Sequence, residues 1–206
     1  DDDGLRSIVR GYYAMVSEVD HHVGRILDAL EDSGQAENTL VLFISDHGEW
    51  LGEHWRFGKG YPGHDATARV PLLARWPGRL DAPGRTCHDL IEAVDVAPML
   101  LEAAAVPIEP SLQGRSFLGT LTQGQPHGRE SALIEFHHAR SLRTPTHLYV
   151  AHDDGREFLY DQTTPLGPYR DLAATPSCAE LLGTCRRQLL ARMIQAAPKR
   201  ALDWTY

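Results

Sequence analysis

Asp46, His47 and Gly48 are the first residues whose types and spacing could do chemistry. They directly follow an apolar run, and a carboxylate next to a neutral imidazole is a suitable ligand pair for a divalent metal ion. Two ligands alone make a poor metal site, and in isolation Asp46 could cap a turn while His47 fills space. The pair is therefore a candidate half-site whose meaning depends on the residues around it.

Further candidates lie in the stretch that follows. Lys59 offers a compact ammonium charge suited to a developing oxyanion, although an ordinary solvated lysine would look the same in the sequence. His54 and His64 could donate a proton to a leaving group. Arg69 is expected to brace this loop rather than to bind a substrate.

Two predicted strands position these residues. Thr39–Ser45 is apolar and rich in branched side chains, which is typical of a strand buried on both faces in a largely parallel sheet, and Val70–Arg75 is a second strand of the same kind. Ligands collect just beyond the carboxyl ends of such strands, where Asp46 lies. The connection, Glu49–Thr67, is polar and glycine-rich, and loops of this length in compact domains are usually functional.

Helices are expected on either side of these strands. Apolar residues recur every three or four positions over Leu5–Leu30, which predicts a long amphipathic helix. Ala97–Ala105 should be a shorter helix with Asp95 at its N-cap. Ser177 and Glu180 form a capping box that opens a C-terminal helix. The apolar face of that helix includes Leu182, Cys185, Leu189 and Met193.

The second half of the chain predicts a small antiparallel sheet with this last helix laid on it. An irregular, proline- and glycine-rich connection over Val106–His127 separates it from the first half, so the predicted domains are residues 1–110 and 111–206. The strands expected in the second domain are Ala132–Phe136, His147–Ala151 and Glu157–Tyr160.

Composition excludes several classes of protein. A chain of 206 residues with 42% hydrophobic residues can bury a core, and its net charge of −8 argues against a nucleic-acid partner, which needs clustered basic residues. No apolar run is long enough to span a membrane, and no export signal is visible, so no membrane partner is expected. The three cysteines do not form a disulfide framework and favour a reducing compartment such as the cytoplasm. Cys178 and Cys185 are expected to be buried core residues.

Five motifs follow one another in the first half of the chain: SDHGE at Ser45–Glu49, LGEH at Leu51–His54, GKG at Gly58–Gly60, ARVPLL at Ala68–Leu73 and WPG at Trp76–Gly78. In this order and spacing they resemble the C-terminal half of the sulfatase family in the alkaline-phosphatase-like superfamily. The resemblance covers nearly the whole chain and implies an α/β fold: part of an α/β/α sandwich followed by the small antiparallel sheet and C-terminal helix.

The resemblance implies roles for three residues. It maps Asp46 and His47 onto the metal-binding pair of the family's DHG or DNG motif, and Lys59 onto a lysine that contacts the transferred sulfate or phosphate group. One divalent ion, Ca²⁺ or Mn²⁺, is implied, with histidine shifting the preference away from calcium. The other ligands and the Cys-x-Pro-x-Arg motif that yields formylglycine are expected upstream, because no cysteine here stands in that motif. The chain is therefore expected to be part of a larger sulfatase and inactive alone.

Two alternatives stay open. A phosphonate or phosphate ester hydrolase of the same superfamily is expected to share His47 and the spacing to Lys59, so a small-molecule sulfate ester is not the sole candidate substrate. The missing nucleophile also allows a non-catalytic module. If the chain folds alone, its exposed sheet surface predicts self-association into a homo-oligomer.

Overall fold

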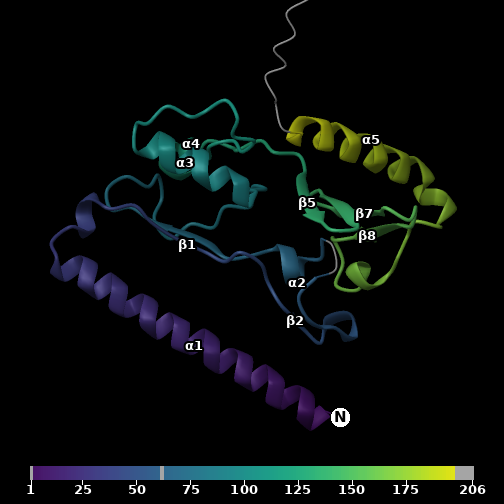
Figure 1. The fold of residues 1–206 in the computed structure, drawn as a ribbon, viewed down its shortest axis with the longest axis horizontal. Coiled ribbons are helices and arrows are strands. Elements are labelled where there is room, and N and C mark those ends of the chain that lie inside the picture. The colour runs from purple at the N-terminus through teal and green to yellow at the C-terminus, as the bar shows by residue number, and fades with distance from the viewer. Residues whose placement is uncertain (1, 61–62, 198–206) are drawn as a thin grey trace, which may run out of the picture.

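The computed structural model describes residues 2–60 and 63–197, which form a mixed α/β chain in two halves (Figure 1). The first half contains the long helix α1 (Asp2–Asp32) and a two-stranded ladder of β1 (Val41–Ile44) and β4 (Leu72–Arg75). The second half contains a four-stranded sheet packed against helix α5 (Ala179–Ala196). Of the helices within these described residues, none is long and apolar enough to cross a bilayer.

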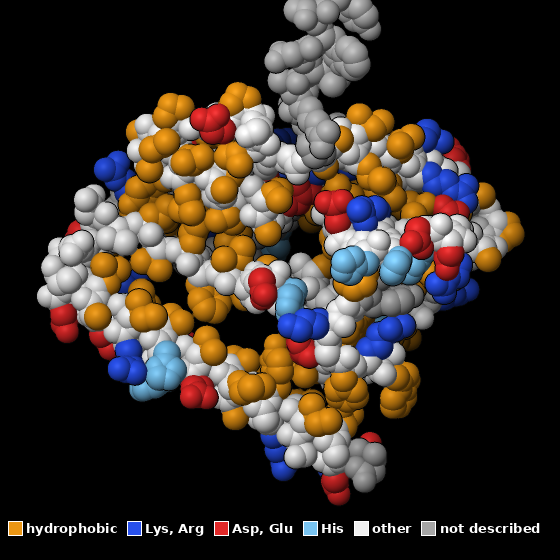
Figure 2. All heavy atoms as spheres, in the orientation of Figure 1, with side chains coloured by type: hydrophobic (Ala, Val, Ile, Leu, Met, Phe, Trp, Pro, Cys, Tyr) orange, Lys and Arg blue, Asp and Glu red, His pale blue; other side chains and the backbone are white. Residues whose placement is uncertain are grey.

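Helix α1 confirms the predicted amphipathic helix, but its apolar face is not buried. Within the described chain none of its residues is buried, and Figure 2 shows hydrophobic side chains reaching the surface along it. A groove of about 450 Å³ separates it from Trp50 and Phe57. An ion pair of 2.7 Å between Glu31 and Arg75 fixes its C-terminal end. The large apolar side chains of α1 that stay exposed are Ile8, Tyr13, Met15, Val16, Val19 and Ile26.

Strands β1 and β4 pair in the antiparallel direction, so this pair differs from the largely parallel sheet that the sequence predicts. Val41 lies opposite Arg75 and Ile44 opposite Leu72. The chain between them folds back on itself, and antiparallel neighbours need no crossover helix. The side chain of Leu73 is 62% exposed, so within the described residues the strands are not covered on both faces. The larger α/β/α sandwich stays a prediction.

The connection between β1 and β4 is structured rather than an open loop. It contains a short hairpin of β2 (Trp50–Leu51) and β3 (Phe57–Gly58) and the one-turn helix α2 (Asp65–Ala68). Trp50 is 1% exposed, and its indole Nε1 donates a hydrogen bond of 2.8 Å to the carbonyl oxygen of Gly60. This buried indole anchors the segment that carries Lys59.

The C-terminal sheet is an antiparallel meander of β5 (Ala132–Phe136), β6 (Ala139–Arg143), β7 (His147–His152) and β8 (Glu157–Asp161). Three of these strands confirm the sequence prediction, whereas β6 was not predicted. The predicted burial of Cys185 is confirmed, but Met193 is 41% exposed. The core between the sheet and α5 consists of Leu142, Tyr149, Leu159, Leu182, Cys185 and Leu189.

The connection before this sheet also differs from expectation. It contains helix α4 (Leu118–Gln123) after α3 (Val96–Ala103), so it is not irregular throughout. No side chain caps α3 within the described residues, because the Asp95 carboxylate turns back to accept the backbone N–H of Glu92 at 2.8 Å. The capping box predicted at Ser177 does not form either, since α5 follows a 3₁₀ turn and has no side-chain cap in the described structure.

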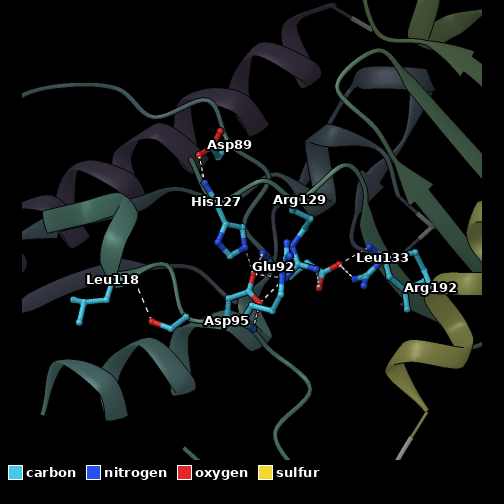
Figure 3. Close-up of polar contacts among 10 residues, drawn as sticks. Asp89, Glu92, Asp95, Leu118, His127, Arg129, Leu133 and Arg192 are labelled. Carbon is cyan, nitrogen blue, oxygen red and sulfur yellow. Dashed lines mark hydrogen bonds and ion pairs between the residues drawn. The ribbon is translucent and has the colours of Figure 1, made fainter. Parts of the chain in front are cut away.

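A buried ionic cluster joins the two halves (Figure 3). Asp95 is fully buried and accepts two hydrogen bonds from Arg129, at 2.5 and 2.7 Å, while Glu92 pairs with Arg129 and Arg192 at 2.7 Å each. Arg129 precedes β5 and Arg192 belongs to α5, so the acidic residues before α3 hold both elements of the C-terminal half. We call Glu92, Asp95, Arg129 and Arg192 the ionic clamp.

Candidate functional site

Asp46, His47 and Lys59 meet at the end of β1. The ammonium nitrogen Nζ of Lys59 lies 3.2 Å from Nε2 of His47, and Oδ2 of Asp46 lies 3.5 Å from the same nitrogen. The Asp46 side chain is 83% exposed and the His47 side chain 39% exposed. The structure therefore brings together the predicted metal-binding pair and the predicted substrate lysine on an open face of the chain.

Hydrogen bonds around His47 define which ring nitrogen carries the lone pair. Its Nδ1 lies 2.9 Å from the carbonyl oxygen of Gly48, which can only accept, so Nδ1 is the donor. Nε2 is then the acceptor that receives Lys59, and it is the nitrogen a metal ion would use. The backbone N–H of His47 and the adjacent imidazole lower the pKa of Asp46, so its carboxylate is charged and also able to bind a cation.

Gly48 is required because the backbone of α2 lies directly against it. A methyl group placed on Gly48 would stand 2.1 Å from the carbonyl oxygen of Ala66, well inside van der Waals contact. The amide of Gly48 donates to the carbonyl of Thr67 at 2.8 Å. The glycine therefore serves close backbone approach, not a positive φ, and it fixes the turn that carries His47.

The segment after Lys59 is laid along the C-terminal sheet. A methyl group on Gly63 would lie 2.6 Å from the side chain of Ser141 on β6, and Asp65 accepts hydrogen bonds from Arg143 at 3.0 and 3.3 Å. Arg69, predicted to brace this segment, makes a long contact of 4.0 Å with Asp65, and its side chain is 79% exposed. Arg143, which the sequence did not single out, is the main brace.

His54 and His64 belong to an aromatic cluster. Their ring centroids are 4.4 Å apart, and the ring of His54 stacks on Tyr169 at 4.4 Å. His64 also lies 4.9 Å from Tyr160 and 5.4 Å from Trp50. His54 adopts a left-handed φ of +53°, which is uncommon outside glycine. The cluster joins the β2–β3 hairpin to β8, and nothing in the sequence linked these aromatic residues in advance.

Burial makes His64 a weak base. It is 4% exposed, and this desolvation lowers its pKa to about 4, with the neighbouring His54 adding to the effect. Burial also lowers the pKa of His54. A proton donor must hold its proton at the working pH. At neutral pH His64 is the neutral form, so its position favours a packing role over proton donation.

We expect His64 to make the protein less stable in mild acid. The unfolded chain binds a proton at this side chain near pH 6.5, whereas the folded chain binds it only near pH 4, so stability is complete above pH 6.5 and falls between those values. The loss should be of the order of 3 kcal/mol. Urea unfolding at pH 7 and pH 4.5 measures it. The difference in the free energy of unfolding between the two pH values should shrink in His64→Phe. It should not shrink in His22→Phe, because the His22 side chain is exposed. An unchanged difference in His64→Phe would contradict the role given to His64.

Asp46 and His47 together fit part of a metal site. An oxygen of Asp46 and Nε2 of His47 converge, and an imidazole with a carboxylate suits Mn²⁺ or a zinc-like ion better than an all-oxygen calcium site. Over residues 2–60 and 63–197 there is no group of three or more His, Cys, Asp or Glu side chains that could hold an ion. Within the described residues, Asp46 and His47 could therefore supply two ligands to an ion.

Comparison with known proteins identifies the family. The sequence profile named Sulfatase matches residues 1–106, just over half of the chain, so the chain belongs to the sulfatase family of the alkaline phosphatase superfamily. This confirms the predicted resemblance. Its motifs SDHGE, LGEH and GKG all lie inside the matched residues.

Three similar proteins show how much of the chain is shared. It is 38% identical over 114 residues to an arylsulfatase of Clostridium perfringens, which covers 54% of this chain and 24% of that protein. It is 27% identical over 216 residues to the multifunctional alkaline phosphatase superfamily protein PehA of Trinickia caryophylli, covering 99% of this chain and 41% of PehA. The crystal structure of a phosphonate monoester hydrolase of Agrobacterium radiobacter superposes with a TM-score of 0.84 at 28% identity, covering 92% of this chain and 42% of that one.

The chain therefore spans about a quarter to two fifths of the length of these relatives. The superposition on the phosphonate monoester hydrolase covers 92% of this chain, so the mixed α/β fold of the chain, with a small antiparallel sheet and a C-terminal helix, matches that structure.

Proposed function

We propose that this chain forms part of the active site of a sulfate ester hydrolase. Asp46 and His47 bind one divalent metal ion, Ca²⁺ or Mn²⁺, and Lys59 binds the sulfate group of the substrate. The observation that carries the proposal is the contact of 3.2 Å between Lys59 Nζ and His47 Nε2, with Asp46 beside the same nitrogen. Membership of the sulfatase family supports it.

The charges at this site suit a sulfate ester. The metal, when bound, polarises the ester oxygens and neutralises developing negative charge. Lys59 donates a hydrogen bond to Nε2 of His47, the same nitrogen that would bind the ion. When a metal ion binds there, the ammonium group of Lys59 must turn toward another acceptor. A sulfate oxygen next to the metal ligands is such an acceptor. Formylglycine, the nucleophile typical of this family, has no matching Cys-x-Pro-x-Arg motif in this sequence.

The metal-binding pair can be tested on this chain. Titration with Mn²⁺, followed by the loss of the electron paramagnetic resonance signal of the free ion, should show binding that Asp46→Asn and His47→Ala each weaken by at least about tenfold. Asp153→Asn is a matched control, because Asp153 also pairs with a histidine, His138, on an exposed surface at 2.9 Å. Equal Mn²⁺ affinity in all four proteins would refute the metal site.

A second candidate is the hydrolysis of a phosphonate or phosphate ester. It is favoured by the superposition on the phosphonate monoester hydrolase, which covers more of this chain than the arylsulfatase match does. A tetrahedral phosphonate carries the same kind of oxygen acceptors for Lys59, so geometry does not separate the two esters. The ratio of kcat/KM for 4-nitrophenyl sulfate and for a phenyl phosphonate ester decides between them.

His54 and His64 take a supporting part in this proposal. His64 holds the hairpin to the C-terminal sheet, and His54 is the more accessible of the two imidazoles. If either donates a proton to the leaving group, it is His54. The activity of His54→Gln should then fall most for esters with poor leaving groups.

A further inference from the structure

The turn between β5 and β6 reaches the segment that carries Lys59. The turn consists of Phe136, His137 and His138, and we call it the Phe136 turn. A methyl group on Gly60, the residue after Lys59, would lie 3.1 Å from Cζ of Phe136. An aromatic ring from the C-terminal sheet is therefore in contact with the backbone next to the substrate lysine.

Two further contacts fix the direction of this segment over the sheet. Gly63 packs against Ser141, in the middle of β6, and Asp65 pairs with Arg143 at its end. The contacts at positions 60, 63 and 65 thus move steadily along the sheet, away from the Phe136 turn. Followed from position 65 back to position 60, the segment therefore approaches the Phe136 turn as it approaches Lys59. Lys59 must then lie at the turn end of the sheet, not at its centre.

The Phe136 turn is open to solvent although it carries an apolar ring. Phe136 is 41% exposed, and the ring of His137 lies 6.0 Å from it in an edge-on arrangement. His138 is held away by its ion pair with Asp153. Phe136 packs against Gly60, the residue after Lys59, and its half-exposed ring with an imidazole at its edge offers one apolar face and one hydrogen-bonding edge.

We propose that the Phe136 turn forms the wall of the substrate site that contacts the alcohol part of the ester, and that Phe136 packs against a ring of that part. The proposal rests on the function proposed for Lys59. The charged end of the ester lies at Lys59 and His47, and its ring lies against the face of Phe136, where ring–ring contacts are favourable. Phe136 is in this sense a specificity residue, and His137 serves polar substituents of the ring.

Binding measurements on the 206-residue chain separate the two ends of the ester. Sodium sulfate, methyl sulfate and 4-nitrophenyl sulfate are titrated by calorimetry in the presence of Mn²⁺. Phe136→Ala should weaken binding of 4-nitrophenyl sulfate by about three- to tenfold and leave sulfate and methyl sulfate unchanged within about twofold. Phe136→Leu keeps the apolar volume but loses the ring face, so it should show most of the same loss. Tyr13→Ala, which removes an exposed aromatic ring from α1, is the matched control.

A second measurement does not depend on the variants. In the unaltered protein, the amide resonances of residues 136–138 should shift with 4-nitrophenyl sulfate and not with sulfate alone. If Lys59→Ala abolishes binding of all three probes while Phe136→Ala changes none, the proposed function stands and the Phe136 wall is wrong. If the aryl ester binds no better than methyl sulfate, or the turn resonances stay in place, the wall is likewise wrong. If Lys59→Ala binds all three probes as tightly as the unaltered protein does, the function proposed for Lys59 is wrong, whatever the effect of Phe136→Ala.

Discussion

Lys59→Ala should reduce kcat/KM for 4-nitrophenyl sulfate by about 10²–10³-fold, the cost of removing one preorganised donor from the site of developing charge. The measurement is made in an enzyme that contains this sequence together with the nucleophile motif. Lys59 lies 3.2 Å from His47 of the proposed metal-binding pair, so its charge is placed where the sulfate oxygens would meet the proposed metal ligands. Lys59→Arg keeps the charge but not the compact geometry, and a smaller loss is expected.

Arg69→Ala is the control for this prediction. Arg69 belongs to the same connection between β1 and β4, but its side chain is 79% exposed and makes only a 4.0 Å contact with Asp65. Its removal should change kcat/KM by less than about threefold, because exposed ion pairs contribute little. Equal activity of Lys59→Ala and the unaltered enzyme, toward both the sulfate and the phosphonate ester, would leave Lys59 as an ordinary surface lysine.

The candidate site could be found from the sequence because its residues are close together and have distinctive types. Asp46 and His47 end an apolar strand, and Lys59 follows within a glycine-rich connection, so the order of the motifs predicts all three. Their contact is now visible in the distances around Nε2 of His47. The aromatic neighbours of His64 were not predictable in this way, since Tyr160 comes from a strand almost a hundred residues later.

The fold could be predicted where the apolar periodicity is strong, and the prediction failed where tertiary contacts decide the local structure. Helix α1 and strands β5, β7 and β8 follow apolar patterns that a single sequence reveals. Strand β6 has the sequence ARSLR, whose two arginines look like a loop; it is a strand because Ser141 and Leu142 are fully buried between its neighbours. The pairing direction of β1 and β4 could not be predicted either, because an apolar run does not show whether the neighbouring strand is parallel or antiparallel.

Asp95 shows most clearly how a local rule can mislead. Its position before an apolar helical run predicted an N-cap, yet its carboxylate accepts from Arg129, from the backbone of Glu92 and from the backbone of Arg115 at 2.7 Å. The partners that decide its role lie 20 and 34 residues away. Only tertiary structure could reveal that this acid belongs to the ionic clamp.

Breaking the ionic clamp should have the largest effect on stability. Arg129→Met removes the partner of Asp95, which is fully buried, and leaves an uncompensated charge inside the protein. The expected loss in the free energy of unfolding is about 3–5 kcal/mol, measured by urea denaturation at pH 7. Because Arg129 and Arg192 both bind Glu92, the loss should also loosen the attachment of α5. Faster hydrogen exchange at amides of α5 would report this directly.

The matched control is Arg156→Met, which breaks the exposed pair of Arg156 with Asp154, also 2.7 Å long. Its cost should stay below about 1 kcal/mol, because exposed charges remain solvated when separated. The double variant Arg129→Met with Asp95→Asn should recover part of the loss, since the stranded carboxylate is then neutral. A cost for Arg129→Met no larger than for Arg156→Met would mean that the pairing of Asp95 with Arg129 does not stabilise this junction. The two halves would then be held together mainly by the contacts of the Lys59 segment with the C-terminal sheet, which include the ion pair of Asp65 with Arg143 and the packing of His64 on Tyr160.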